Sequence, residues 1–374
     1  MIFTLALRNL FHDGVRFAGT LIGIGFSIFL VAVQLGLYLG FSNQISAMID
    51  RTTGELWIVP NGTKSFEEAS ALDVSERYVA LAVPGVADVV PFVVGFMEWR
   101  RPSGEAATVV IVGTDPVYGL APWNIVEGSL ADLAVADGVV IDKTYLAELG
   151  VHGRGDTAQI EGHTVRVVAL TQNIRAFTTT PYVFTTLERA RNYISLGSGE
   201  ATHFMVRTAP GADPAAVRAA IAARLTTSEV MTKAEYAARS RNHWLFSTGA
   251  GFALIAGAIL GLVVGTVIVA QTLYSSTKDH IAEFATLRAI GSTSGYIHKV
   301  ILCQALISAA IGFSVAALAG ILTMVLTAEA VLPVVVTANL LAMLLALTVV
   351  MCVVSALAAI AKVTRIDPAV VFAR

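Results

Sequence analysis

The stretch FAGTLIGIGFSIFLVAVQLGLYLGFSNQISAMI, residues 17–49, decides the fold class, because it contains no Asp, Glu, Lys or Arg. A helix needs about 20 apolar residues to cross the hydrocarbon core of a bilayer. Three further runs, 244–277, 300–328 and 330–361, are also free of these residues and exceed that length. The 374-residue chain is 14% charged, against about 25% for a soluble domain. The sequence therefore predicts a multi-pass membrane protein, and its composition excludes a nucleic-acid binder, a disordered tail and an ordinary cytosolic enzyme.

The four runs divide the chain into membrane segments and water-exposed segments. We expect transmembrane helices at 17–40, 244–273, 300–328 and 332–361, joined by a large domain at 41–243, a loop at 274–299 and a short loop at 329–331. Residues 1–16 suit an interfacial helix, and 362–374 form a tail. The first apolar run exceeds the core of a cleaved signal peptide, about 7–15 residues, so we interpret it as a retained anchor.

The distribution of charge sets the expected orientation. The two tails and the 274–299 loop together carry 8 basic and 4 acidic residues, whereas 41–243 with Glu329 carries 17 basic and 23 acidic residues. Basic residues near membrane ends favour the cytoplasmic side. We therefore expect the chain in the inner membrane. Both termini and the 274–299 loop should lie in the cytoplasm, and the large domain should lie outside.

The large domain reads as α+β. Short apolar alternations at 55–59, 89–99 and 108–112 predict strands, and helical patterns occupy 75–83, 142–149 and 213–225. We expect two lobes: one formed by both ends of the segment, and another, about 115–200, inserted between them. Cys303 and Cys352 both fall within predicted spans, so the external domain has to be stable without a disulfide.

Motifs for chemistry are lacking in the sequence. It has no G-x-x-x-x-G-K-[ST] phosphate loop, no G-x-S-x-G elbow and no H-E-x-x-H pattern. We therefore predict no catalytic residue, no metal site and no cofactor bound by this chain. In the spans the strongly polar side chains are Gln34 and Gln271. An ion-coupled transporter usually needs a buried acid or base at that depth, so we expect the energy to come from a partner.

Glycines recur at four-residue spacing in the second span, at Gly257, Gly261 and Gly265. Small residues at this spacing let two helices approach closely in lipid. They serve either packing within the chain or a contact between two copies, and the sequence leaves both open.

The cytoplasmic loop is the most specific segment. Residues 278–290 suit a helix with acidic residues early and Arg288 late, which matches the helix dipole. Gly291 suits the position after its end, and Ser292 or Thr293 can cap the next helix. An apolar stripe on this helix rests on lipid or offers a contact to a partner. The candidate coupling residues are Asp279, Ile281, Glu283, Phe284, Leu287, Arg288 and Gly291.

The segment EFATLRAIG, residues 283–291, resembles the loop after the second span in FtsX/MacB-type ABC transporter permeases. AQTLY at 270–274 is most similar to the DevC-type exporter branch, and RIDPA at 365–369 resembles the family's tail. The order of one span, a large external domain and three spans also agrees with the family. The resemblance implies a MacB-like domain at 41–243, with a porter-like lobe plus an inserted lobe, and an FtsX-like permease domain at 244–374.

The resemblance further implies a permease homodimer that works with a separate ABC ATPase, which would use ATP and Mg²⁺. The coupling residues would seat on that ATPase, and its stroke would move the external domains by mechanotransmission. A periplasmic adaptor and an outer-membrane duct complete the path in the DevC and MacB branches; the sequence leaves both open here.

Two alternatives to an exporter of an amphipathic or lipophilic substrate remain at this point. An FtsX-like mechanotransmitter would regulate cell-envelope enzymes without transport. A membrane receptor with an external sensor is disfavoured by the short tails. Aromatic residues at the outer ends of two spans are either substrate contacts or an interface belt: Tyr38, Phe41, Trp244 and Phe246.

Overall fold

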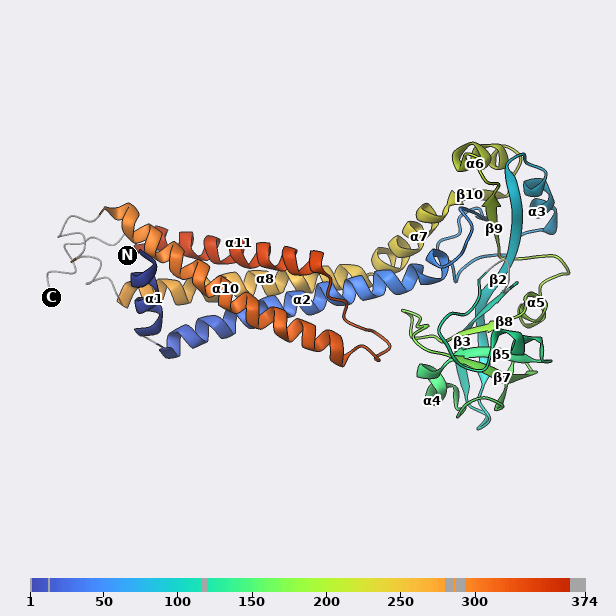
Figure 1. Cartoon of the computed structure of the whole chain (residues 1–374), viewed down its shortest axis with the longest axis horizontal. Coiled ribbons are helices and arrows are strands. Elements are labelled where there is room, and N and C mark those ends of the chain that lie inside the picture. Colours follow the sequence, from blue (N-terminus) through green and yellow to red (C-terminus); the bar gives the residue numbers. More distant parts are fainter. Residues whose placement is uncertain (1, 13, 116–119, 280–285, 287–292, 364–374) are drawn as a thin grey trace. The chain divides into compact units, whose positions relative to one another are not determined.

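The computed structural model describes residues 2–12, 14–115, 120–279, 286 and 293–363, and the chain divides into two compact units. The membrane unit contains residues 1–40, 251–328 and 333–374, and the external unit contains 41–250 and 329–332. Each unit is described by itself. Figure 1 labels the elements of both.

The membrane unit is built from helices. They are α1 (Ile2–His12), α2 (Gly14–Asp50), α8 (Ala250–Asp279), α10 (Ser294–Leu326) and α11 (Ala338–Val363). Among the described residues, four of these helices, all except α1, are long and apolar enough to cross a membrane. Helices are favoured there because every backbone polar group must be satisfied inside the segment when the surroundings are lipid. A small-residue-rich core, which includes Ile24, Ala305 and Ala356, lies between them.

Several helix boundaries differ from the sequence prediction; α8 ends at Asp279 rather than 273, and α10 begins at Ser294 rather than 300. The first helix continues to Asp50 instead of ending at residue 40. The second begins at Ala250 rather than 244, because Gly249 takes a left-handed φ of 83° and separates α8 from the preceding π-helix η3 (His243–Ser247). The fourth begins at Ala338 rather than 332. Residues 333–337 are non-helical, and the Thr337 hydroxyl accepts from the Leu340 N–H at 3.1 Å, as a capping side chain does at a helix start.

The glycines of the membrane unit mark close helix approaches. A Cβ on Gly23 would lie 2.7 Å from Ile268, and one on Gly312 would clash with Ile24. A Cβ on Gly265 would clash with Ser27 and lie 2.9 Å from the Met351 sulfur. Helix α2 therefore packs against both α8 and α10 with little space to spare.

The external unit is an α/β domain on one mixed sheet with the order β10-β1-β9-β2-β3-β8-β5-β7-β4. The outlying strand β6 pairs with β2 and β7. The strands are β1 (Leu56–Pro60), β2 (Val86–Arg100), β3 (Ala106–Thr114), β4 (Ile125–Glu127), β5 (Gly138–Asp142), β6 (Thr157–Ile160), β7 (His163–Thr171), β8 (Tyr182–Thr185), β9 (His203–Thr208) and β10 (Ser228–Thr232). Its α-helices are α3 (Val74–Leu81), α4 (Leu146–Leu149), α5 (Leu187–Ile194), α6 (Pro214–Ala222) and α7 (Lys233–Asn242), and its 3₁₀ turns are η1 (Leu130–Ala134) and η2 (Lys143–Tyr145).

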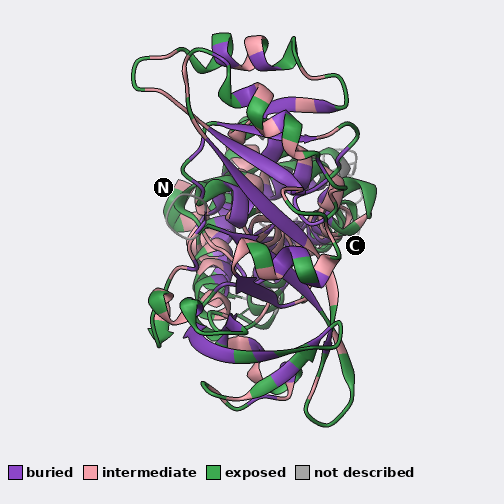
Figure 2. Cartoon of the chain, turned by 90° about the vertical axis from the view of Figure 1, so that its right-hand side faces the viewer, coloured by how far each residue is buried: buried purple, intermediate pink, exposed green. Residues whose placement is uncertain are grey.

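The long strand β2 belongs to both lobes of this unit. Its first part pairs with β9, and its second part, from Phe92 to Arg100, pairs with β3. The inserted lobe therefore begins inside β2, earlier than the expected residue 115, because one continuous strand carries the chain from the first lobe into the second. Figure 2 shows how buried residues follow the strands.

The helix starts of the external unit follow local rules. Asp213 caps α6 by accepting from the Ala215 N–H at 3.0 Å, with Pro214 at the first helical position, as the sequence predicts. Thr232 and Glu235 form a capping box at the start of α7. The predicted helix 142–149 is instead the short turn η2 followed by α4, with the Asp142 side chain accepting from the Thr144 N–H.

We predict that Gly265→Val destabilises the membrane unit by about 1–3 kcal/mol, because the added atoms overpack the contact with Ser27 and Met351. The thermal midpoint of the purified chain in detergent should fall. Gly19→Val is the matched control, since a Cβ there meets no atom within 4 Å. An equal midpoint for both variants would contradict the close packing of α8 on α2.

Candidate coupling and transmission site

The predicted coupling residues fall on a segment that the structure describes only at its borders. Asp279 is the last residue of α8. Ile281, Glu283, Phe284, Leu287, Arg288 and Gly291 lie outside the described residues, so their role stays a prediction. On the far side, Thr293 occupies the N-cap of α10 with an extended backbone but without a side-chain capping bond.

The three glycines of α8 lie against α2 of the same chain. A Cβ on Gly257 would lie 2.8 Å from the Gln34 side chain, and one on Gly261 would lie 3.1 Å from Leu30. Packing within the chain accounts for this face. The opposite face of α8 carries exposed apolar side chains, which include Phe252, Ile259 and Val263.

The four aromatic residues proposed as substrate contacts fall in different units. Tyr38 belongs to the membrane unit, whereas Phe41, Trp244 and Phe246 belong to the external unit. Phe246 is 47% exposed. Trp244 is instead engaged inside the external unit, where its ring lies 4.8 Å from that of Phe177.

Trp244 belongs to a cluster that the sequence did not predict. We call it the base cluster, and its members are Glu67, Phe177, Tyr182 and Trp244. The buried Glu67 carboxylate accepts from the Tyr182 hydroxyl at 2.8 Å and from the Trp244 indole N–H at 3.1 Å. Tyr182 opens β8 of the inserted lobe, and Trp244 lies in η3, directly before α8. One carboxyl group thus joins the loop after β1, the inserted lobe and the segment that continues into the second membrane helix.

Burial raises the pKa of Glu67, since removal from water penalises the charged form more than the hydrogen bonds from Tyr182 and Trp244 favour it. Next to it, His243 lies 3.5 Å from the Glu68 carboxylate. Arg51, one residue beyond the end of α2, lies 4.4 Å above the ring of Trp123, a cation–π contact. The segment that follows α2 and the segment that precedes α8 are therefore both held by contacts within the external unit.

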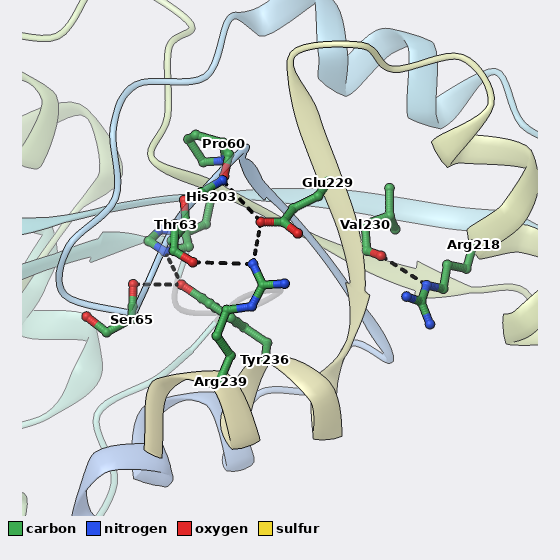
Figure 3. Close-up of polar contacts among 10 residues, drawn as sticks. Pro60, Thr63, Ser65, His203, Arg218, Glu229, Val230, Tyr236 and Arg239 are labelled. Carbon is green, nitrogen blue, oxygen red and sulfur yellow. Dashed lines mark hydrogen bonds and ion pairs between the residues drawn. The ribbon is translucent and has the colours of Figure 1, made fainter. Parts of the chain in front are cut away.

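Helix α7, which precedes η3, is held by a second polar network (Figure 3). The Tyr236 hydroxyl donates to the Ser65 carbonyl at 3.2 Å and lies 2.7 Å from His203 Nε2. Burial lowers the pKa of His203 to about 3, which keeps the ring neutral. Arg239 on the same helix pairs with Glu229 of β10. These contacts fix α7 to β9, β10 and the loop after β1.

Hollows in the described part of the external unit include the following two. One of about 490 Å³ lies between α6, α7 and β10, lined by residues that include Arg218 and Arg239. Arg218 is engaged there, donating to the Val230 carbonyl and pairing with Glu235 at 2.8 Å. The other, of about 370 Å³, borders Arg101 and Thr157. Within the described residues no cluster of three or more His, Cys, Asp or Glu side chains suits a metal ion.

The geometry defines a multi-pass membrane protein whose external α/β domain is inserted between its first and second spans. Family models agree: the MacB-like periplasmic core domain matches residues 17–224, and the FtsX-like permease C-terminal domain matches 255–368. The chain belongs to the FtsX/MacB-type family of ABC transporter permeases.

Solved structures of external domains are similar to part of the chain. The periplasmic region of MacB from Actinobacillus actinomycetemcomitans is 15% identical with a TM-score of 0.38, covering 49% of this chain and 90% of its own. The extracellular domain of the noncanonic ABC-type transporter YknZ from Gram-positive bacteria is 14% identical with a TM-score of 0.34, covering 48% and 98%. A domain of a protein described as a "putative Permease protein" from Porphyromonas gingivalis is 11% identical with a TM-score of 0.32, covering 50% and 90%. No curated protein matches the chain significantly.

We predict that the external unit is more stable at mildly acidic pH, through Glu67. Its pKa in the folded state lies above the ordinary value of 4.5, so this stabilisation is complete below pH 4.5 and is lost as the pH rises through the folded-state pKa. Glu67→Gln should flatten the decline of the unfolding midpoint between pH 4.5 and 8. The control is Glu127→Gln, at an exposed position. A Glu67→Gln profile that parallels the wild type would show that Glu67 does not titrate in this range.

Proposed function

We propose that this chain is the permease subunit of an ABC exporter, in which a separate ATPase drives an amphipathic or lipophilic substrate outward by mechanotransmission. The observation that carries the proposal is the succession of a MacB-like core domain and an FtsX-like permease domain on one chain with four apolar helices. The family consists of permease components of ABC transporters, which work with an ATPase. Assignment to the DevC branch rests on residues 270–274 alone and stays part of the proposal.

The proposed route of movement begins at residues 279–291 on the ATPase and follows α8 to its first residue, Ala250. Beyond it, η3 carries Trp244, which the Glu67 carboxylate holds together with Tyr182 of the inserted lobe. Because α7 is pinned by Tyr236 and Arg239, a displacement of η3 would move the lobes rather than bend the helix before it. ATP and Mg²⁺ belong to the ATPase in this scheme, and the permease performs no chemistry.

The remaining parts of the assembly are proposals of the same kind. They comprise a permease homodimer, an inner-membrane location with cytoplasmic termini, and a periplasmic adaptor with an outer-membrane duct. The family match equally supports an FtsX-like mechanotransmitter without transport. We favour export because the external domain, with two lobes on a ten-stranded sheet, is larger than force transmission alone requires.

We predict that Glu283→Lys and Phe284→Asp weaken recovery of a Walker-motif ATPase when the tagged chain is purified from native membranes. The first change reverses a charge and the second places a carboxylate on the apolar stripe, so both disturb a docked helix. Glu329→Lys is the matched charge reversal, on the segment expected outside. Normal recovery with both loop variants would show that the coupling segment lies elsewhere, and no ATPase with the wild type would favour the receptor alternative.

We also predict how a permease homodimer will cross-link through α8. Val263→Cys, at a position 54% exposed, should join two copies, whereas Gly261→Cys, which faces Leu30 of its own chain, should not. Cross-linking in native membranes followed by denaturing gel electrophoresis measures both. A dimer band with Gly261→Cys alone would return the glycine face to the interface between copies.

A further inference from the structure

The connection between α10 and α11 contains a non-helical segment, here called the outer strap (residues 329–335), and α2 carries a row of two glycines and a glutamine along one face. Among the described residues of the strap, none is helical. The row on α2 is Gly36, Gly40 and Gln44, one residue per helical turn and therefore on one face.

Residues 333–335 of the strap pack against Gly36 and Gly40 within the membrane unit. The Val335 N–H donates to the Gly36 carbonyl at 3.1 Å. A Cβ on Gly36 would lie 2.6 Å from a Val334 methyl group, and one on Gly40 would clash with the Pro333 carbonyl. Val334 is only 4% exposed, and its N–H donates to the Thr327 hydroxyl at 3.1 Å. Only glycine leaves room for the strap at these two turns of α2.

The tip of the strap is engaged within the external unit. The Gln44 side-chain amide donates to the Val331 carbonyl at 2.9 Å. The Val331 side chain packs against the apolar cluster of the inserted lobe, which includes Trp99 and Ile111. Val331 is partly buried against that core although it lies in the connection between two membrane helices.

We propose that the outer strap is a fixed mechanical link, seated on Gly36, Gly40 and Gln44, through which α10 and α11 move the inserted lobe together with α2. The inference rests on the proposed function and deepens it, because it adds a second route to the one through α8 and η3. The strap joins α10 to α11 along the chain, residues 333–335 contact α2 within the membrane unit, and Val331 packs against the core of the inserted lobe within the external unit. A segment with a hydrogen bond at each end and a packed tip is suited to carry displacement rather than to open.

The first experiment tests the packing of the strap on α2, here called the seat, and it needs no ATPase. In a chain with Cys303→Ala and Cys352→Ala, a Val334→Cys probe in nanodiscs should react slowly with a maleimide. Adding Gly40→Val should raise the rate about tenfold, because opening exposes a buried position, and Gly19→Val should leave it unchanged. Gln44→Leu removes the hydrogen bond without adding bulk and should raise the rate in the same direction. Unchanged labelling in both strap variants would overturn the seat.

The link is tested next in the complex with the ATPase. Hydrogen exchange in residues 172–181 and 243–247 is compared with and without ATP and vanadate. We expect the nucleotide-dependent difference to survive when Gln44→Cys and Val331→Cys are joined by a short bifunctional reagent, and to be lost in Gly40→Val and Gln44→Leu. A difference that persists in the released variants, or disappears in the cross-linked chain, would overturn the fixed link. No difference in the wild type would instead contradict the proposed function, while the labelling result would still decide the seat.

Discussion

Close packing against α2 is the constraint on which the membrane unit depends. In lipid, apolar side chains gain little by burying themselves against one another, so helices associate where small residues let their backbones approach. Gly265 and Gly312 bring α8 and α10 against α2 near Ser27 and Ile24, and Gly36 and Gly40 admit the outer strap. One helix therefore contacts α8, α10 and the outer strap through positions where any side chain would need space already filled.

The external unit solves a different problem, since water surrounds it and a conventional apolar core stabilises it. Strand β2 pairs with β9 along its first part and with β3 along its second, so the two lobes share one sheet. The largest buried cluster includes Met48 and Ile49 of α2 as well as residues of both lobes. The inserted lobe is thus not a loosely tethered module. A displacement that enters the lobe at the base cluster would have to be carried by the sheet as a whole.

Polar groups are concentrated where that displacement would enter. Glu67 is buried and held by Tyr182 and Trp244, a costly arrangement unless the carboxyl group is hydrogen-bonded or protonated. His203 and Tyr236 form a neutral network that fixes α7. In a permease that transmits force, directional contacts of this kind hold the segment before the second span in one geometry, whereas an apolar contact would allow it to slide. The family membership and these contacts are the observations on which the proposal of mechanotransmission rests.

The sequence by itself determined the number and approximate position of the spans, the capped start of α6, the presence of a large domain between the first two spans and the family, because each follows from local composition or from short motifs. It also indicated the close helix packing, although the spacing of Gly257, Gly261 and Gly265 did not identify α2 as the partner. Only the tertiary structure decided the base cluster and the outer strap. Glu67 and Trp244 are 177 residues apart, and Gln44 and Val331 are 287 apart. No periodicity or motif records which side chains meet over such separations, since that depends on how the sheet and the helices pack.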